Sequence, residues 1–298
     1  MKRIILFNLI LFLLTVGFAQ KKEPAKIDRW SGLGFDFYVG GGIYFADSKT
    51  AQYYNADPSH EVNLGLLFDN KYRYDEITKL IINNYPYVDS IWFDPADLPK
   101  KVKYKLGMCL GLGMKYQFHK NWGLMINYSH IRLTASDVFL IRFPQPPGNI
   151  RNDYAMEYLK AVEERSFFDV GITHTFHAHQ TLRPFLEMGL QFNYIKVRSF
   201  EAIIEDRPFD LLGSVSTPYV PGQQVTPNYR NWGAPGYGLS FSGGVKIIFN
   251  QIFSLDPVAF FSISSMGHSD NLIGYNQGFT FNYGIMIRLV MSDLYFNK

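Results

Sequence analysis

Residues 104–118 read YKLGMCLGLGMKYQF, and this stretch decides the fold. Its even positions, from Tyr104 to Phe118, are all apolar or aromatic, whereas its odd positions are glycine, lysine, glutamine or Cys109. Alternation with a period of two residues is the pattern of a β-strand. Strands of soluble proteins average about 5–6 residues, whereas a strand that crosses a membrane needs roughly 9–11. The stretch therefore predicts a membrane-spanning strand.

The same alternation recurs along the chain. A weaker example, 252–263, is interrupted by Pro257. The clear examples are 35–45, 122–129, 168–176, 186–194, 237–249 and 279–289. Together with the first stretch they predict eight strands, an even number that closes a barrel and leaves no unpaired edge in lipid.

The lengths of the connections support this interpretation. Short and long connections alternate strictly. The short ones are 119–121, 178–181 and 250–251, and the long ones are 47–103, 135–161, 201–235 and 264–276. Bacterial outer-membrane barrels have short periplasmic turns and long external loops. We therefore expect an all-β fold, an antiparallel up-and-down transmembrane β-barrel of about eight strands with both termini in the periplasm. If 62–68 paired with 88–93 as a further hairpin, the count would become ten.

The N-terminus has the features of a signal peptide. Lys2 and Arg3 precede an apolar run over residues 4–16, which is shorter than the roughly 20 residues of a spanning helix, and small residues end at Ala19. We expect residues 1–19 to be cleaved and 20–298 to form a single barrel domain. The cleaved chain loses two positive charges, so its formal net charge falls from +3 to +1. This charge gives no sign of nucleic-acid binding.

The pattern resembles the small OmpA/OmpX-like family of Gram-negative outer-membrane proteins. The resemblance covers the eight strands and the alternating loops. In addition, 284–291 followed by Leu294-Tyr295-Phe296 is similar to the aromatic-ended last strand of such proteins, although Asn297-Lys298 departs from it. The resemblance implies an eight-stranded barrel in the outer membrane.

Charged residues on the inward face of the strands form the first candidate site. An eight-stranded interior is just wide enough for side chains to fill it, and an unpaired buried charge is costly. We therefore expect a paired charge network, although an ion path is the other interpretation. Its members are Asp36, Lys105, Lys115, Asp169, Arg183, Glu187, Lys246, Asp256 and Arg288.

The long loops form the second candidate site, because they are rich in aromatic residues, which recognition surfaces favour. Asp75–Ile82 and the stretch NDYAMEYLKAVEER (152–165) are predicted to be helices within them. The candidate partner-binding residues are Tyr53, Tyr54, Tyr72, Tyr74, Trp92, Tyr219, Tyr229 and Trp232.

Catalytic and metal sites are weakly indicated. His174, His177 and His179 lack an evident third ligand, so they are better explained as residues of the membrane interface. The segment His268-Ser269-Asp270 resembles the grouping of an outer-leaflet lipid hydrolase of the lipid A deacylase kind, but adjacent residues of a strand point to opposite faces. We expect no metal and no cofactor, and Cys109 is expected to be a small packing residue.

The sequence thus favours a non-enzymatic barrel whose external loops bind a partner. Such a protein would contact outer-membrane lipid and one or more envelope proteins, as a subunit or accessory of a secretion or uptake assembly. The alternatives are a narrow pore or solute channel, and the lipid hydrolase.

Overall fold

The computed structural model describes residues 34–119, 121–145, 152–176, 182–216, 219–222, 233–249, 252–266 and 278–292. All of them belong to one compact unit, Gly32–Lys298. The predicted signal peptide, residues 1–19, lies outside the described residues.

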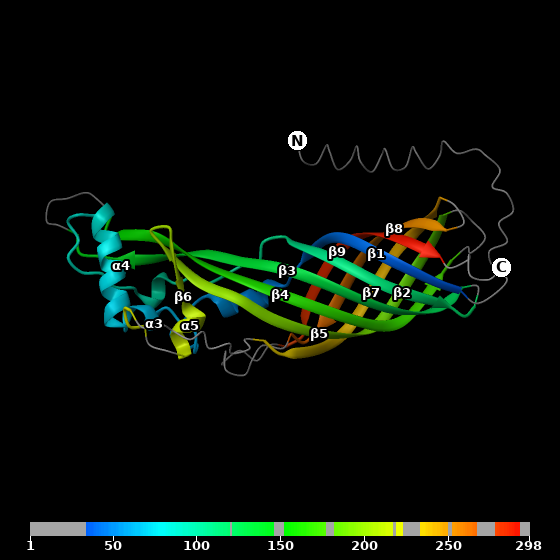
Figure 1. Cartoon of the computed structure of the whole chain (residues 1–298), viewed down its shortest axis with the longest axis horizontal. Helices are drawn as coiled ribbons and strands as arrows, with labels where there is room; N and C mark the ends of the chain where they lie inside the picture. The colour runs from blue at the N-terminus through cyan, green and yellow to red at the C-terminus, as the bar shows by residue number, and fades with distance from the viewer. Residues whose placement is uncertain are drawn as a thin grey trace. The chain divides into compact units, whose positions relative to one another are not determined.

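Antiparallel strands close into a ring of eight (Figure 1). These are β1 (Gly34–Phe45), β2 (Gly107–Gln117), β3 (Trp122–Arg142), β4 (Tyr154–Thr175), β5 (Leu182–Ile204), β7 (Pro235–Ile248), β8 (Phe253–Ser264) and β9 (Thr280–Ser292). Each pairs with the next, and β9 pairs with β1 to close the ring. The short β6 (Arg207–Asp210) pairs with β5 outside the ring. The eight-stranded prediction is confirmed.

The further hairpin that would raise the count to ten is not formed. Residues 65–68 are helical, and Trp92 pairs with Arg142 of β3 in an isolated bridge. The ring therefore stays at eight strands.

Apolar side chains cover the outside of the barrel. Val39, Leu110, Leu190 and Ile285 are each about 60% exposed, and aromatic residues flank them, among them Trp122 and Tyr283. An apolar surface this extensive would be unfavourable in water, whereas an apolar band between aromatic girdles is what lipid requires. The barrel lies in the bacterial outer membrane. Among the described residues, no helix has the length and apolar character to span a membrane.

The two ends of the barrel differ. One end carries the three short turns together with the start of β1 and the end of β9, and we call it the turn end. At the other end, the loop end, β3, β4 and β5 continue well beyond their neighbours (Figure 1). They contain 21, 22 and 23 residues, compared with 11 in β2. External loops of such barrels are the long ones, so the loop end faces the outside.

The predicted helix over 152–165 is wrong, because this stretch is the outer part of β4. It pairs with β3 from Arg142↔Tyr154 onward without interruption. Ala155, Leu159 and Ala161 face a buried core, whereas Met156 and Tyr158 are exposed. Its helix-favouring composition is overridden because the neighbouring strands supply its hydrogen bonds.

Helices pack on one face of these extended strands. We call them, together with 135–143, 154–163, 197–204 and β6, the cap. They are α2 (Ser48–Ala51), η1 (Gln52–Tyr54), α3 (Gly65–Phe68), α4 (Lys71–Asn84), η2 (Pro95–Asp97) and α5 (Leu211–Ser216). The helix predicted over Asp75–Ile82 is confirmed within α4. The cap has its own apolar core, which includes Leu64, Ile77, Ile81, Phe139 and Phe200.

Two register shifts occur where the barrel meets the cap. Met108 lies opposite Arg132, so a regular ladder would place Lys105 opposite Ala135. Tyr104 lies opposite Ala135 instead, which means that this segment contains one extra residue. The extra residue turns Tyr104 inward and leaves Lys105 exposed. The prediction that Lys105 lies in the barrel interior is therefore wrong. On β5, Arg198 is the extra residue, because Val162 pairs with Ser199 and Glu163 with Val197.

Candidate functional site

The turn-end half of the lumen holds a balanced charge network. Glu187 accepts hydrogen bonds from Lys115, at 2.6 Å, and from Arg288, at 2.8 Å. Asp256 lies 3.8 Å from the same lysine, and Lys246 pairs with Asp36. Asp169 and Arg183 are also buried. Apart from Lys105, every predicted member of the interior network lies inside the barrel.

A second, fully buried ion pair lies at the loop end of the lumen, and we call it the mouth pair. Glu163 and Arg165 are adjacent inward residues of β4, and the Nε of Arg165 donates to Glu163. Tyr54 and Tyr104 donate their hydroxyl protons to the other carboxylate oxygen, at 2.6 and 2.8 Å. The guanidinium also donates to Thr50 Oγ1, at 2.9 Å. The mouth pair therefore ties the first external loop to the barrel wall.

Sequence reasoning missed the mouth pair. The sequence predicts a loop helix over 152–165, and in a helix two residues such as Glu163 and Arg165, which are two positions apart, do not share a face. In a strand they do, so a period-two interpretation of 154–165 would have placed both charges inward.

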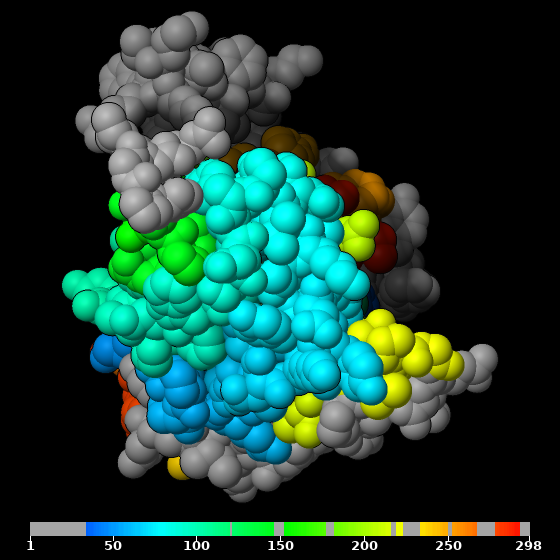
Figure 2. All heavy atoms as spheres, turned by 90° about the vertical axis from the view of Figure 1, so that its left-hand side faces the viewer, coloured from blue at the N-terminus to red at the C-terminus, as the bar shows by residue number. Residues whose placement is uncertain are grey.

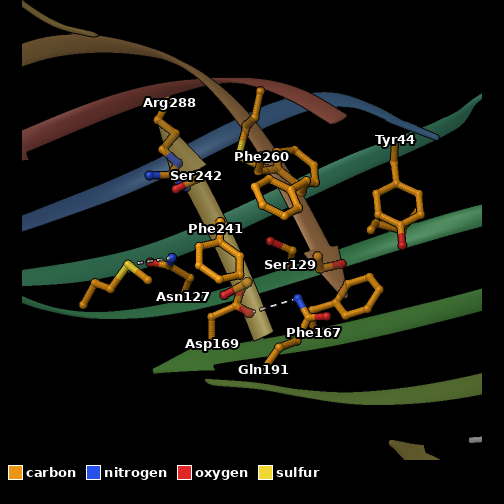
Figure 3. Close-up of a pocket in the computed structure, with 16 residues that line it drawn as sticks. Tyr44, Asn127, Ser129, Phe167, Asp169, Gln191, Phe241, Ser242, Phe260 and Arg288 are labelled. Carbon is orange, nitrogen blue, oxygen red and sulfur yellow. Dashed lines mark hydrogen bonds between the residues drawn. The ribbon is translucent and has the colours of Figure 1, made fainter. Parts of the chain in front are cut away.

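Between the two charge clusters lies a small chamber that both polar and apolar side chains line (Figure 3). Its volume is about 40 Å³, and Asp169 accepts a hydrogen bond from Gln191 at 3.0 Å across its wall. Among the described residues, the side-chain oxygens of Asn127 and Gln191 have no hydrogen-bond partner. A space of this size with several polar groups on its wall suits one or two ordered water molecules and is too small for a passing solute.

An aromatic layer separates this chamber from the mouth pair. The ring of Tyr44 lies 5.8 Å from that of Phe167 and 6.3 Å from that of Phe260. Cys109 packs in the same buried cluster, which fits its prediction as a packing residue. Along β4 the inward side chains read Glu163, Arg165, Phe167 and Asp169 from the loop end. Within the described residues, the lumen therefore holds, from the loop end to the turn end, the mouth pair, the aromatic layer, the chamber and the charge network.

The aromatic residues of the cap divide into buried and exposed groups. Tyr53 and Tyr54 are 5% and 2% exposed, because they pack in the cap core and at the mouth pair. The prediction that these two contact a partner is therefore wrong. Tyr74 is partly buried, and its hydroxyl donates to the carbonyl of Ile91 at 3.1 Å.

Tyr72 and Trp92 are exposed, as a partner-binding residue must be. Tyr219 is half-buried, with the guanidinium of Arg73 3.6 Å from its ring centre. Tyr229 and Trp232 lie outside the described residues. Figure 2 looks onto the loop end, where atoms of the first external loop, blue to cyan, cover much of the surface.

The extended strands also expose an apolar surface on the side away from the cap core. Met156 and Tyr158 are 62% and 53% exposed, and they pair with Leu140 and Ile203 respectively. Trp92, at 45%, continues the row at the tip of β3. We call Trp92, Leu140, Met156, Tyr158 and Ile203 the uncovered face. Sequence reasoning missed most of it, because β4 was expected to be helical here.

Of the residues in the weakly indicated catalytic and metal motifs, the structure describes His174. The ring of His174 lies between those of Trp122 and Phe176, with centroid distances of 4.4 and 4.6 Å, which suits a residue of the membrane interface. His177, His179 and His268-Ser269-Asp270 lie outside the described residues. In the part of the chain that the structure covers, no three histidine, cysteine, aspartate or glutamate residues gather as a metal site would require.

Of the comparisons with known proteins, only the one with solved structures finds similar proteins. No protein-family model matches the sequence, and no curated protein matches it. The chain is similar to Neisserial surface protein A, with a TM-score of 0.40, 8% identity, and coverage of 86% of this chain and 96% of that one. It is also similar to OprG from Pseudomonas aeruginosa, with a TM-score of 0.40, 11% identity, and coverage of 88% of this chain and 96% of that one. For Ail of Yersinia pestis, in complex with the heparin analogue sucrose octasulfate, the TM-score is 0.35 and the identity 8%, with coverage of 87% of this chain and 98% of that one.

The strand ring and its lipid-facing surface define the class of this chain on their own. Eight antiparallel strands close on themselves, apolar residues face outward, and short turns alternate with long connections. The protein is a small outer-membrane β-barrel with an ordered external cap.

Proposed function

We propose that this barrel is a non-enzymatic, non-conducting anchor whose cap binds an envelope protein, as a subunit or accessory of a secretion or uptake assembly. The observation that carries the proposal is the uncovered face. Three barrel strands extend to build the cap, and the cap presents large apolar side chains to the outside. Ordered, exposed apolar patches of this kind are typical of protein-binding surfaces.

The packed lumen argues against the pore alternative. A conducting path would have to cross the network around Glu187, the aromatic layer at Phe167 and the mouth pair, all of which are buried. Opening it would separate charges that are paired in a low-dielectric interior, at several kcal/mol for each pair. We expect single-channel recordings in planar bilayers to show no reproducible conductance step.

The experiment that tests the proposal is affinity purification of the tagged protein from native outer membranes in mild detergent. Stoichiometric recovery of another envelope protein is the expected result. The variant Trp92→Ser/Met156→Ser/Tyr158→Ser should lose that protein, because it removes the three most exposed side chains of the uncovered face.

Tyr72→Ser removes an exposed residue of α4 that the sequence also predicts to bind a partner but that is not part of the uncovered face, so this variant tests whether binding extends beyond that face. It should retain the partner. Recovery of the wild-type protein alone, as a monomer, would refute a docking function.

A further inference from the structure

A cluster of basic side chains lies on the outside of the barrel at the loop end. Arg132 of β3 lies opposite Glu164 of β4, which lies opposite Lys196 of β5. Arg132 and Lys196 are exposed, and the side chain of Glu164 is only 19% exposed. One row of the wall therefore presents two positive charges to the outside.

The two register shifts add two more basic residues at this height. The shift before β2 leaves Lys105 exposed, and its backbone N–H donates to the carbonyl of Thr134 at 2.8 Å. The shift on β5 places Arg198 outside the ladder, where its side chain is 48% exposed. We call Lys105, Arg132, Lys196 and Arg198 the rim cluster.

One acidic residue does not neutralise the rim cluster. Glu164 accepts from Arg198 at 2.6 Å and also lies within electrostatic range of Arg132. Within the described part of the chain, no ion pair involves Lys105, Arg132 or Lys196. The cluster thus has four positive charges and one negative charge on β3, β4, β5 and the segment just before β2. With strands roughly 4.8 Å apart, it spans about 14 Å.

The rim cluster lies directly above the lipid-facing surface. The next row toward the membrane holds His130, whose Nδ1 lies 3.4 Å from Ser166 Oγ, and that hydroxyl lies 3.2 Å from Tyr128 Oη. Below it, Phe168 and Phe192 are 43% and 54% exposed to the hydrocarbon. Glu164 and Phe168 are four residues apart, which is about 13 Å along a strand. A lipid can therefore lay its acyl chains on the aromatic residues while its headgroup reaches the basic ones.

We propose that the rim cluster binds the phosphate groups of a phosphorylated lipid in the leaflet around the loop end. Guanidinium groups match phosphate oxygens in pairs, and Arg132 and Arg198 supply two such groups beside the ammonium group of Lys196. The hydroxyl and imidazole groups of the row below are further hydrogen-bond donors for the headgroup. This inference does not depend on the docking function of the cap.

The test measures binding of bisphosphorylated lipid A to the full-length protein in detergent micelles by native mass spectrometry. The variant Arg132→Gln/Lys196→Gln/Arg198→Gln removes three charges of the rim cluster. Near an anionic lipid surface, each basic residue is worth about a fivefold change in affinity, so we expect a loss of about 100-fold. Higher salt should weaken binding to the wild type more steeply than binding to the variant.

The matched control is Lys71→Gln/Lys79→Gln/Arg207→Gln, which removes the same charge from exposed positions of α4 and β6. It should bind within about twofold of the wild type, since the effect of charge falls off within roughly one Debye length. Arg132→Lys/Arg198→Lys keeps the charge and should restore most of the binding, which separates loss of charge from misfolding. Unaltered heat-modifiable migration in gels confirms that each variant is folded.

Two further arms identify the source of the phosphate. A phosphate-free glycolipid with similar acyl chains should bind weakly to the wild type and the rim variant alike, and 10-fold excess inorganic phosphate should displace little lipid A. Equal lipid A binding by the wild type and the rim variant would overturn the proposal. Inorganic phosphate that binds the wild type as tightly as lipid A does, and is lost with the rim variant, would overturn the assignment to a lipid.

Discussion

Replacing Arg165 with methionine tests whether the mouth pair holds the cap on the barrel. Methionine keeps much of the length of the side chain but removes the guanidinium, which donates to Glu163, Thr50 and Asn282. Glu163, which is fully buried, then loses the guanidinium while it still accepts from the hydroxyl groups of Tyr54 and Tyr104.

The magnitude follows from the burial of both partners. Removing one member of a buried ion pair leaves an uncompensated charge and costs about 3–5 kcal/mol. In the double variant Glu163→Gln/Arg165→Met that charge is gone, and the remaining loss is that of neutral hydrogen bonds, about 1 kcal/mol each. We therefore expect the double variant to be more stable than Arg165→Met alone.

The assay is guanidinium unfolding of the protein in lipid vesicles, followed by tryptophan fluorescence. Arg198→Met is the matched control, because Arg198 pairs with Glu164, the neighbour of Glu163 on β4, but is 48% exposed. Exposed pairs contribute about 0–1 kcal/mol. If Arg165→Met costs no more than Arg198→Met, the mouth pair does not stabilise the protein and our account of it is refuted.

Three further predictions follow from the geometry. Burial raises the pKa of Glu157, in the cap part of β4 outside the membrane, to about 7. The stability that the protonated carboxyl group gives the cap is full below the ordinary carboxyl pKa of 4.5 and is lost as the pH rises through about 7. The protection factors of cap amides, that is, their exchange rates relative to the intrinsic rate at each pH, should therefore fall between about pH 5 and pH 7. Glu157→Gln should remove that fall, whereas protection that is independent of pH in the wild type would contradict the assignment. Gly171→Val should prevent assembly of the barrel, since a Cβ at Gly171 would lie 2.1 Å from the carbonyl oxygen of Met188 on β5; a heat-modifiable band of wild-type intensity would show that the ladder tolerates it. Lys115→Met should destabilise the barrel by about 3–5 kcal/mol in the same unfolding assay, because it leaves Glu187 and Asp256 with one cation fewer, and a loss below 1 kcal/mol would contradict the network.

The sequence sufficed to predict the barrel itself. Alternation in stretches such as 104–118 follows directly from the contrast between lipid outside and a polar lumen inside. The same contrast predicts that seven of the eight charges of the turn-end network face inward, and the weaker strand adds Asp256. Short turns and long loops then set the orientation.

The cap was less predictable because both faces of its strands carry apolar residues. In the outer part of β4, Ala155 and Leu159 face the cap core while Met156 and Tyr158 face outward. This arrangement erases the period-two signal and leaves a composition that favours a helix.

Single-residue shifts are also hidden from the sequence, which is why Lys105 was placed inside. Aromatic residue type does not tell a core tyrosine from a surface one either. Tyr54 and Tyr72 look equivalent until their contacts are known.

The mouth pair also has a consequence for the order in which the molecule is completed. Its contacts join the loop after β1 to β4 and to β9, because Asn282 of β9 binds both Arg165 and the backbone N–H of Asp47. The earliest and latest parts of the barrel chain thus meet at one point, across the seam where β9 joins β1. The complete set of these contacts includes Asn282 of β9, so it exists only in a molecule in which that seam has formed. A partner that recognises the completed cap therefore also recognises a completed barrel.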